Sequence, residues 1–193
     1  GRRTATDRFG HPLESIASMN AIGTAEIALR FVLPQTMGSF AKVIGFDIVS
    51  RYTATFDPVY ATLYRNGDTA PVALQRMTLA QAPGGVPVGA SGFLCRFLWN
   101  TDVGQGIGPQ LCTFGTPYHL ALAVPIAFLS WIISALQVTE AADFRAYPWG
   151  TGFTVASRTI GASPEITGGA AFTQSATQLK QRPYIFPLVT DWG

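Results

Sequence analysis

Charged side chains are scarce in this sequence. Only 12% of the residues are Asp, Glu, Lys or Arg, while 48% are hydrophobic. A typical soluble domain carries about 25% charged residues. The chain therefore lacks the charge with which a monomer usually covers its surface. Two explanations are open: neighbouring protein copies cover much of the surface, because interface cores are depleted in charge, or a membrane does.

Lysine is nearly absent, since Lys42 and Lys180 are the only two among 13 Lys and Arg residues. The formal net charge is +2. So small a net charge argues against tight, sequence-independent binding of nucleic acid by the whole domain, which needs a basic face. The preference for Arg suits packed interfaces, because guanidinium is weakly hydrated and pairs in a planar fork.

Cysteine is also rare, with Cys95 and Cys112 lying seventeen residues apart without Cys or His neighbours. This spacing excludes the usual zinc-site patterns, and we expect no metal and no cofactor. Both residues lie in apolar runs, where we expect reduced, buried thiols. The chain has no Asn-x-Ser/Thr site and no signal peptide, and it begins with Gly. The missing glycosylation site and signal peptide favour maturation in the cytosol. The first Gly indicates either proteolytic processing or the boundary of an expressed fragment.

Signals of catalysis are missing too, and we expect that the protein is not an enzyme. The only histidines are His11 and His119, and no Gly-x-Ser-x-Gly motif occurs. Residues 104–108 contain three glycines but lack the Lys and Ser/Thr of a phosphate-binding loop, so they predict a plain loop. A pair of catalytic carboxylates is conceivable, but scattered surface acids are the better interpretation of Asp47, Asp57, Glu140 and Asp143.

Residues 1–22 resemble an arm, because they show little apolar periodicity and include Gly10 and Pro12. At most one or two helical turns fit between Leu13 and Met19. The arm contains three arginines that are candidates to face RNA phosphates in a weak, non-specific contact, and a solvated terminus is the equal alternative. These candidate site residues are Arg2, Arg3 and Arg8.

Short apolar stretches separated by Gly and Pro fill the rest of the chain. Strands are predicted over 24–33, 42–52, 59–64, 72–79, 91–99, 152–160 and 170–179. A tight turn is predicted at Asn66-Gly67-Asp68. The pattern indicates an all-β β-sandwich, jelly roll or barrel. We expect one domain over 23–182 and an extended apolar tail over 183–193.

The longest apolar stretch, residues 119–136, contains no Asp, Glu, Lys or Arg. Its length is near the roughly 20 residues of a spanning helix. Pro125 would break the hydrogen-bond ladder of such a helix, and no Lys or Arg cluster flanks it. The better prediction is two buried strands that meet between Pro125 and Ser130, and hence no membrane span.

Four tryptophans leave a second function open. Trp99, Trp131, Trp149 and Trp192 could form a sugar-binding platform on a lectin-like β-sandwich. Trp is equally enriched in cores and interfaces, and this second interpretation is the favoured one.

The middle of the chain resembles the capsid proteins of picorna-like viruses. The resemblance lies in Pro109 and Gln110, in the alternating run 120–126 with its Val-Pro-Ile step, and in the following Ser130. Residues 93–99 are similar to the strand that precedes this region in those shells. The overall size and first Gly look like the small coat proteins of plant picorna-like viruses of the cheravirus group.

This resemblance implies a fold and a set of partners. The fold would be a single eight-stranded antiparallel jelly-roll β-sandwich with an extended N-terminal arm, whose last two strands would be 152–157 and 171–179. The protein would be a structural subunit of a small icosahedral capsid. It would assemble in the host cytoplasm with related coat proteins around single-stranded genomic RNA, and it would reside in the virion.

Overall fold

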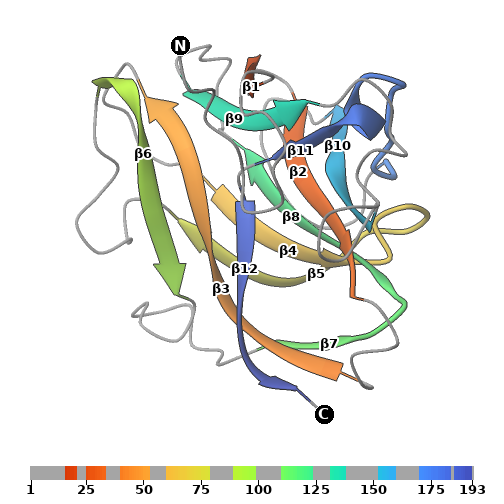
Figure 1. Cartoon of the computed structure of the whole chain (residues 1–193). Coiled ribbons are helices and arrows are strands. Elements are labelled where there is room, and N and C mark those ends of the chain that lie inside the picture. Colours follow the sequence, from red (N-terminus) through yellow and green to blue (C-terminus); the bar gives the residue numbers. More distant parts are fainter. Residues whose placement is uncertain are drawn as a thin grey trace, which may run out of the picture.

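A computed structural model of the chain describes residues 16–20, 25–33, 40–52, 60–78, 89–98, 110–123, 131–137, 152–159, 170–183 and 185–192. This part of the chain is all-β and forms two antiparallel sheets, as in a β-sandwich (Figure 1). The all-β prediction is confirmed. The three-residue 3-10 helix η7 (Gln178–Lys180) is the one helical element in the described residues.

The smaller sheet has five strands in the order β10-β2-β8-β4-β5. These strands are β10 (Phe153–Thr159), β2 (Ala25–Val32), β8 (Pro117–Ala123), β4 (Tyr60–Arg65) and β5 (Val72–Thr78).

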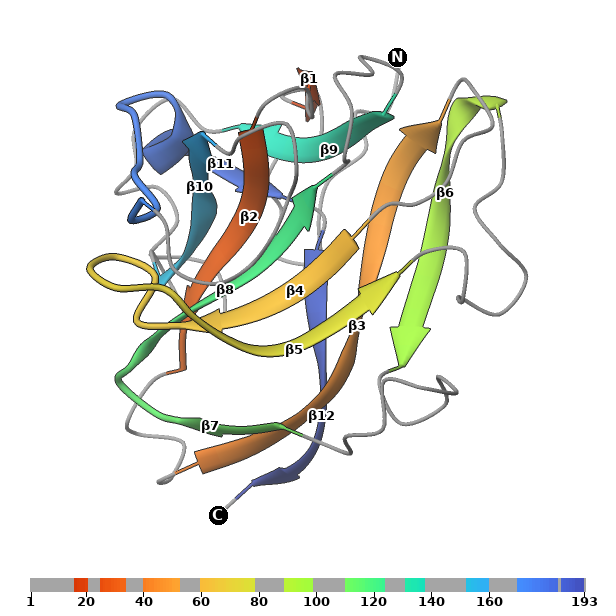
Figure 2. The same cartoon turned by 180° about the vertical axis from the view of Figure 1, so that it is seen from behind.

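The larger sheet has seven strands, and its main path runs β1-β9-β3-β12. Three strands lie off this path: β6 and β7 both pair with β3, and β11 pairs with β9. The strands are β1 (Ile16–Asn20), β9 (Trp131–Gln137), β3 (Phe40–Tyr52), β12 (Ile185–Trp192), β6 (Gly89–Leu98), β7 (Gln110–Thr113) and β11 (Gln181–Pro183). Figure 2 shows the five-stranded sheet in front and the seven-stranded sheet behind it.

Four strand pairs are nested in the sequence. The innermost is the hairpin β4·β5, then come β3·β6 and β2·β8, and the outermost pair is β1·β9. Two further pairings, β3·β9 and β4·β8, join these ladders side by side within each sheet. Eight of the nine strands between residues 16 and 137 therefore belong to this nested set, and β7 is the ninth.

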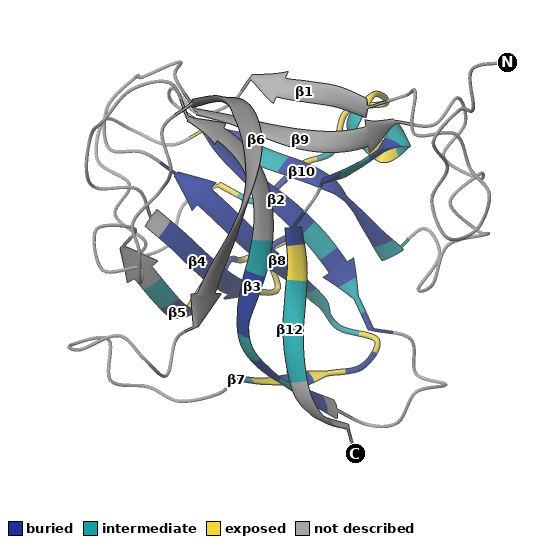
Figure 3. Ribbon diagram, turned by 60° about the vertical axis from the view of Figure 1, so that its left-hand side comes forward, coloured by how far each residue is buried: buried dark blue, intermediate teal, exposed yellow. Residues whose placement is uncertain are grey.

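The core lies between the two sheets. Strand β2 alternates, so that Leu29 and Phe31 point inward while Ala28 and Arg30 point to the opposite face. The Phe31 ring stacks on Tyr118 and lies beside Phe153, with centroid distances of 5.7 and 5.9 Å. Buried strands line this space in Figure 3, and the seven-stranded sheet contributes Ala41, Val43, Phe46 and Ile185.

The turn between β4 and β5 is where the sequence places it. Asn66 has a φ of 55°, a left-handed conformation that Asn tolerates better than most residues. Its carbonyl accepts hydrogen bonds from the amides of Thr69 and Ala70, at 3.1 and 2.9 Å. The turn closes the innermost hairpin.

The apolar stretch 119–136 contributes two strands, β8 and β9, as predicted. β8 is buried at six of its seven positions because both faces of the five-stranded sheet are covered. Within the described residues, no helix has the length and apolar character needed to cross a membrane.

The strand prediction for 170–179 is wrong. Only Thr173 makes a β-bridge, to Ser157, and the chain then turns into η7. Ser175 and Gln178 bond each other reciprocally, since each side chain accepts from the other residue's amide, at 3.1 and 2.8 Å. The alternating pattern arises because one side of an irregular segment is buried, not because the segment belongs to a ladder.

Two shorter elements also differ from expectation. Residues 16–19, where the sequence allowed at most one or two helical turns, belong to strand β1 and pair with β9. Strand β7 was not predicted at all, because four residues carry too little periodicity. In the tail 183–193, residues of β12 pair with β3.

Candidate functional site

The residues that the sequence proposes for RNA contact, Arg2, Arg3 and Arg8, lie outside the described residues, and their role stays a prediction. The same holds for Trp99 and Trp149 of the sugar-platform alternative. The backbones of Trp131 and Trp192 belong to β9 and β12, but their side chains lie outside the described part.

Among the acids considered for catalysis, Asp57, Glu140 and Asp143 lie outside the described residues. Asp47 is half-buried on β3, opposite Arg96 of β6. Within the described part of the chain, no group of three or more His, Cys, Asp or Glu residues could hold a metal ion. Cys112 is a free, buried thiol, and burial raises its pKa to about 12.

The polar side chains that do meet lie on the outer face of the five-stranded sheet. Small residues, Ala28, Ala121 and Ala156, form the floor of this face. Residues 170–177, which we name the cover segment, lie across it and place Phe172 on the small residues, beside Tyr64. All five residues of this second apolar cluster are buried.

The cover segment is attached through its backbone and through one amide side chain. The Phe172 amide donates to the Gly67 carbonyl at 2.7 Å, and the Thr173 and Ser157 amides each donate to the other's carbonyl. Gln174 donates through Nε2 to the Val155 carbonyl at 2.7 Å. These bonds fix the segment to the turn after β4 and to the edge strand β10.

A closed polar triangle lies beneath the cover. Arg158 Nε donates to Glu26 Oε2 at 2.8 Å, and Arg158 Nη2 donates to the Tyr64 hydroxyl at 3.0 Å. That hydroxyl in turn donates to Glu26 Oε1 at 2.9 Å. Glu26 and Arg158 are only 2% and 5% exposed. Each charge has its counter-charge and its hydrogen bonds, which a buried ion pair requires.

Aromatic rings enclose the guanidinium of Arg158. Its central carbon lies 4.7 Å from the centroid of Tyr64 and 4.8 Å from that of Phe172. Arg158 also donates from Nη1 to the Ala170 carbonyl at 3.2 Å. A single side chain therefore joins β2, β4, β10 and the cover segment. Burial is the main reason why the pKa of Tyr64 lies far above its usual range, so the phenol stays neutral.

A second charged pair lies at the rim. Arg30 donates to Asp68 in a bidentate pair, from Nε to Oδ1 at 2.9 Å and from Nη2 to Oδ2 at 2.6 Å. This hydrogen bonding holds the pKa of Asp68 below its ordinary value. The pair ties the turn after β4 to strand β2.

His119 lies between the two charged groups. Its side chain is completely buried, and its ring stacks on Phe172 at a centroid distance of 4.5 Å. Nε2 is 3.5 Å from Asp68 Oδ1, yet neither ring nitrogen makes a hydrogen bond within the described part of the chain. Burial lowers the pKa of His119 to about 4, against the opposing effect of Asp68. The ring is therefore neutral at pH 7.

This arrangement can hold segments together and respond to protons. Glu26, Tyr64 and Arg158 bond one another, and Arg158 also bonds the Ala170 carbonyl. These groups are too buried to meet a dissolved molecule. Sequence reasoning considered only His119 of this group. The sequence did contain one signal of a buried polar cluster. Glu26 and Arg158 are charged residues within predicted strands, and a charge on a buried strand needs a partner.

Comparisons with protein-family models, with curated proteins and with solved structures give no match. The features that define this protein are therefore its two antiparallel sheets, the nested strand pairing and the covered polar cluster.

Proposed function

We propose that this chain is a jelly-roll subunit of a small icosahedral viral shell, which assembles with related coat proteins around single-stranded RNA. The observation that carries the proposal is the nesting of four strand pairs. A jelly roll is an eight-stranded double sheet made of two Greek keys, and it can be described as one long hairpin wound into a sandwich.

The pairing of the eight strands supports that description. Numbered one to eight, β1 to β6, β8 and β9 pair first with eighth, second with seventh, third with sixth and fourth with fifth. The two lateral contacts of such a winding, third with eighth and fourth with seventh, are also present. Two four-stranded orders follow, β1-β9-β3-β6 and β2-β8-β4-β5.

The proposed winding changes which strands come last. The resemblance assigned the last two strands to 152–157 and 171–179, whereas here they are β8 and β9. Strands β10, β11 and β12 then follow the jelly roll as additions, with β10 beside β2 and β12 beside β3. Of the region of closest resemblance, 120–126, the described part, residues 120–123, belongs to the buried strand β8.

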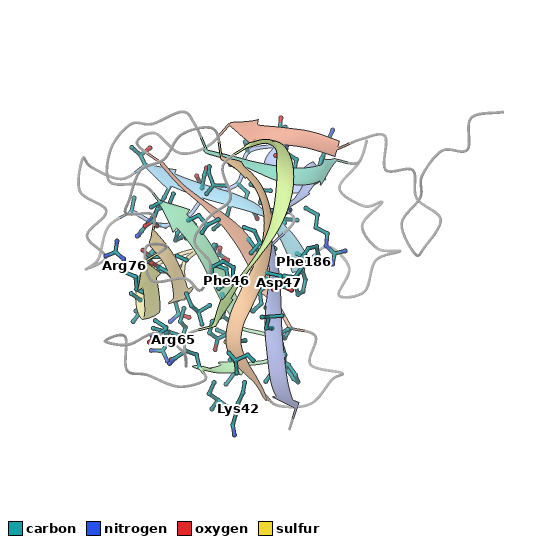
Figure 4. All side chains as sticks on the ribbon, turned by 90° about the vertical axis from the view of Figure 1, so that its left-hand side faces the viewer. Lys42, Phe46, Asp47, Arg65, Arg76 and Phe186 are labelled. Atoms are coloured by element: carbon teal, nitrogen blue, oxygen red, sulfur yellow. The ribbon has the colours of Figure 1, made fainter. Side chains whose placement is uncertain are left out.

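A partly apolar outer surface supports a subunit role. Three residues of β3, Ala41, Val43 and Phe46, are buried. Their neighbours Lys42, Ile44 and Asp47 therefore point away from the core. The pairing of β3 with β12 shifts register between Leu188 and Val189. Leu111 lies opposite Lys42, and Phe186 lies opposite Asp47. Figure 4 labels Lys42, Asp47 and Phe186 on this sheet.

Along this face, exposed or half-exposed apolar residues form a stripe across β7, β3 and β12. Leu111 and Phe186 are 54% and 39% exposed, so both large apolar side chains face solvent in the single chain. The stripe consists of Leu111, Ile44, Leu188 and Phe186. Contact with neighbouring subunits would bury these residues, in agreement with the low charge of the whole sequence.

The fold alone does not define the function, because lectins and cupins share the jelly roll with capsid proteins. The scarcity of charge and the apolar stripe favour assembly over an isolated binding module. A sugar-binding function instead needs exposed tryptophans, for which Trp99 and Trp149 are the candidates.

Assembly is the test. The chain is co-expressed with the other proteins that its own messenger RNA encodes. The purified product is then examined by sedimentation velocity and electron microscopy. We expect closed spherical particles that contain this chain, related subunits and RNA. A chain that stays monomeric under these conditions, at every concentration and ionic strength, overturns the proposal.

Paired variants locate the contact. Leu111→Asp with Phe186→Asp places two charges on the stripe, and assembly should drop at least tenfold while the thermal midpoint stays unchanged. Leu179→Asp is the matched control, because Leu179 is 41% exposed but lies in η7, away from the stripe. Equal loss of assembly in both variants would show that the stripe is not the contact.

A further inference from the structure

His119 occupies a slot that fits only a neutral ring. On one side, the ring stacks on Phe172 with an angle of 15° between the planes. On another side lies Gly67, so close that an added Cβ would be 2.2 Å from Nδ1. The side chain has no exposed surface. The slot therefore closes over the ring when the cover segment is in place.

A second proton on this ring would find little support. Two cations, Arg30 on β2 and Arg158 on β10, raise the energy of a charged imidazole. The nearest anion is Asp68, whose oxygens already accept from Arg30. The other nearby acid, Glu26 on β2, is bonded by Arg158 and by the Tyr64 hydroxyl of β4.

Of the elements around His119, the cover segment is the easiest to displace. His119 itself is on β8, which has β2 and β4 as ladder partners on its two sides. The cover segment has one isolated bridge, at Thr173, and otherwise irregular backbone. Local opening starts where few ladder bonds must break. Lifting Phe172 exposes one face of the His119 ring to water.

We propose that residues 170–177 form an acid-released cover, in which protonation of His119 lifts Phe172 from the outer face of the five-stranded sheet. Release uncovers the small-residue floor of Ala28, Ala121 and Ala156. This device rests on the covered cluster alone and does not depend on the role of the protein in a shell.

The direction of the effect follows from proton binding. The closed state binds a proton at His119 only near pH 4, whereas a solvated histidine does so near pH 6.5. Acid therefore favours the open state between these two values. With these pKa values, the opening constant of the cover rises by up to roughly 70-fold between pH 7.5 and pH 4.5, the full factor applying when the opened ring is fully solvated.

Hydrogen exchange of the full chain tests the proposal. Protection of the 170–180 peptide, corrected for the intrinsic exchange rate, is followed by mass spectrometry from pH 7.5 to pH 4.5. Peptides from β4 and β8 serve as internal references. We expect the cover peptide to lose protection by up to roughly 70-fold, as the linkage predicts, while the reference peptides keep theirs. Equal loss in β4 and β8 would mean global unfolding and would overturn a separate cover.

Three variants separate the trigger from the fold. His119→Leu fills the slot with a neutral side chain and should make protection of the cover independent of pH. His11→Gln, at the other histidine of the chain, should keep the wild-type response. Phe172→Leu keeps the trigger but thins the cover, so the pKa of His119, measured from its ring proton by NMR, should move towards 6.5. A wild-type His119 that titrates near 6.5 while the cover stays protected contradicts the proposal, as does a pH response that survives in His119→Leu.

Discussion

Replacing Gly67 by Ala should destabilise the protein, although the backbone at this position suggests the reverse. Among the described residues, Gly115 is the glycine with positive φ, at 80°, so Gly67 is not in the left-handed region. A glycine in an ordinary conformation usually gains about 0.4–1 kcal/mol when changed to Ala, because the unfolded chain loses freedom. Here the new methyl group would meet a buried ring.

The magnitude follows from the contacts. An added Cβ would lie 2.2 Å from Nδ1, 2.6 Å from Cε1 and 2.9 Å from Cγ of His119. Relaxed carbon contacts are about 3.5–4.0 Å. The ring is held by Phe172, and moving the turn away would weaken the bond from the Phe172 amide to the Gly67 carbonyl. We expect a loss of about 3 kcal/mol, the upper end of the range for overpacked cores.

Urea unfolding, followed by circular dichroism, measures this loss. Thr69→Ala in the same turn is the matched control and should change the free energy of unfolding by less than about 0.5 kcal/mol. In a His119→Ala background the clash is gone, so the two substitutions should be non-additive by about 2 kcal/mol. The predicted clash with His119 is refuted if Gly67→Ala is neutral or stabilising. It is also refuted if the changes in the free energy of unfolding caused by Gly67→Ala and His119→Ala are additive.

Three further predictions concern the buried groups. Arg158→Met leaves the Glu26 carboxylate without its counter-charge and should lower the free energy of unfolding by about 3–5 kcal/mol. The double variant Glu26→Gln with Arg158→Met should lose less stability, because no unpaired charge remains. Equal losses for the two variants in urea unfolding would contradict this. Cys112 should resist iodoacetamide at pH 8 in the native state and react fully in denaturant, because burial protects the thiol and raises its pKa to about 12. Rapid labelling of the native protein, detected by mass spectrometry, would refute the burial of Cys112. The pKa of His119 is lowered in the folded protein, so the unfolded chain binds more protons below pH 6.5. The contribution of His119 to stability should therefore fall by about 3 kcal/mol as the pH drops from 6.5 to 4. In urea unfolding, His119→Leu should lack this part of the pH dependence of the free energy of unfolding.

Much of the strand pattern could be predicted from local sequence. The strands of the five-stranded sheet and the turn at Asn66 follow from short apolar stretches and turn chemistry, both of which act within a few residues. The same reasoning failed at 170–179, where one buried ring, Phe172, produced a strand-like pattern. Alternation reports which side is buried, and it does not report whether the neighbouring backbone pairs.

The polar cluster could not be predicted because its members are far apart in the chain. Glu26 and Arg158 are separated by 132 residues, and only the pairing of β10 with β2 brings them together. Their strands are neighbours in one sheet, with β10 at its edge and β2 beside it, whereas the sequence shows just two isolated charges. Similarly, no residue near His119 in the sequence indicates that Gly67 and Phe172 enclose its ring.

The nested pairing also determines how such a fold can form. Ile16 meets Leu136 in the finished sheet, a contact between distant residues that would be slow to form alone. Once the β4·β5 hairpin exists, however, only the short links 53–59 and 79–88 separate it from the β3·β6 pair, so each later pairing closes a small loop. The sheets can therefore zip outward from Asn66 in a series of local steps. During synthesis, β1 has no partner until β9 has left the ribosome, so within the nested pairs the first strand to be made would be the last to pair.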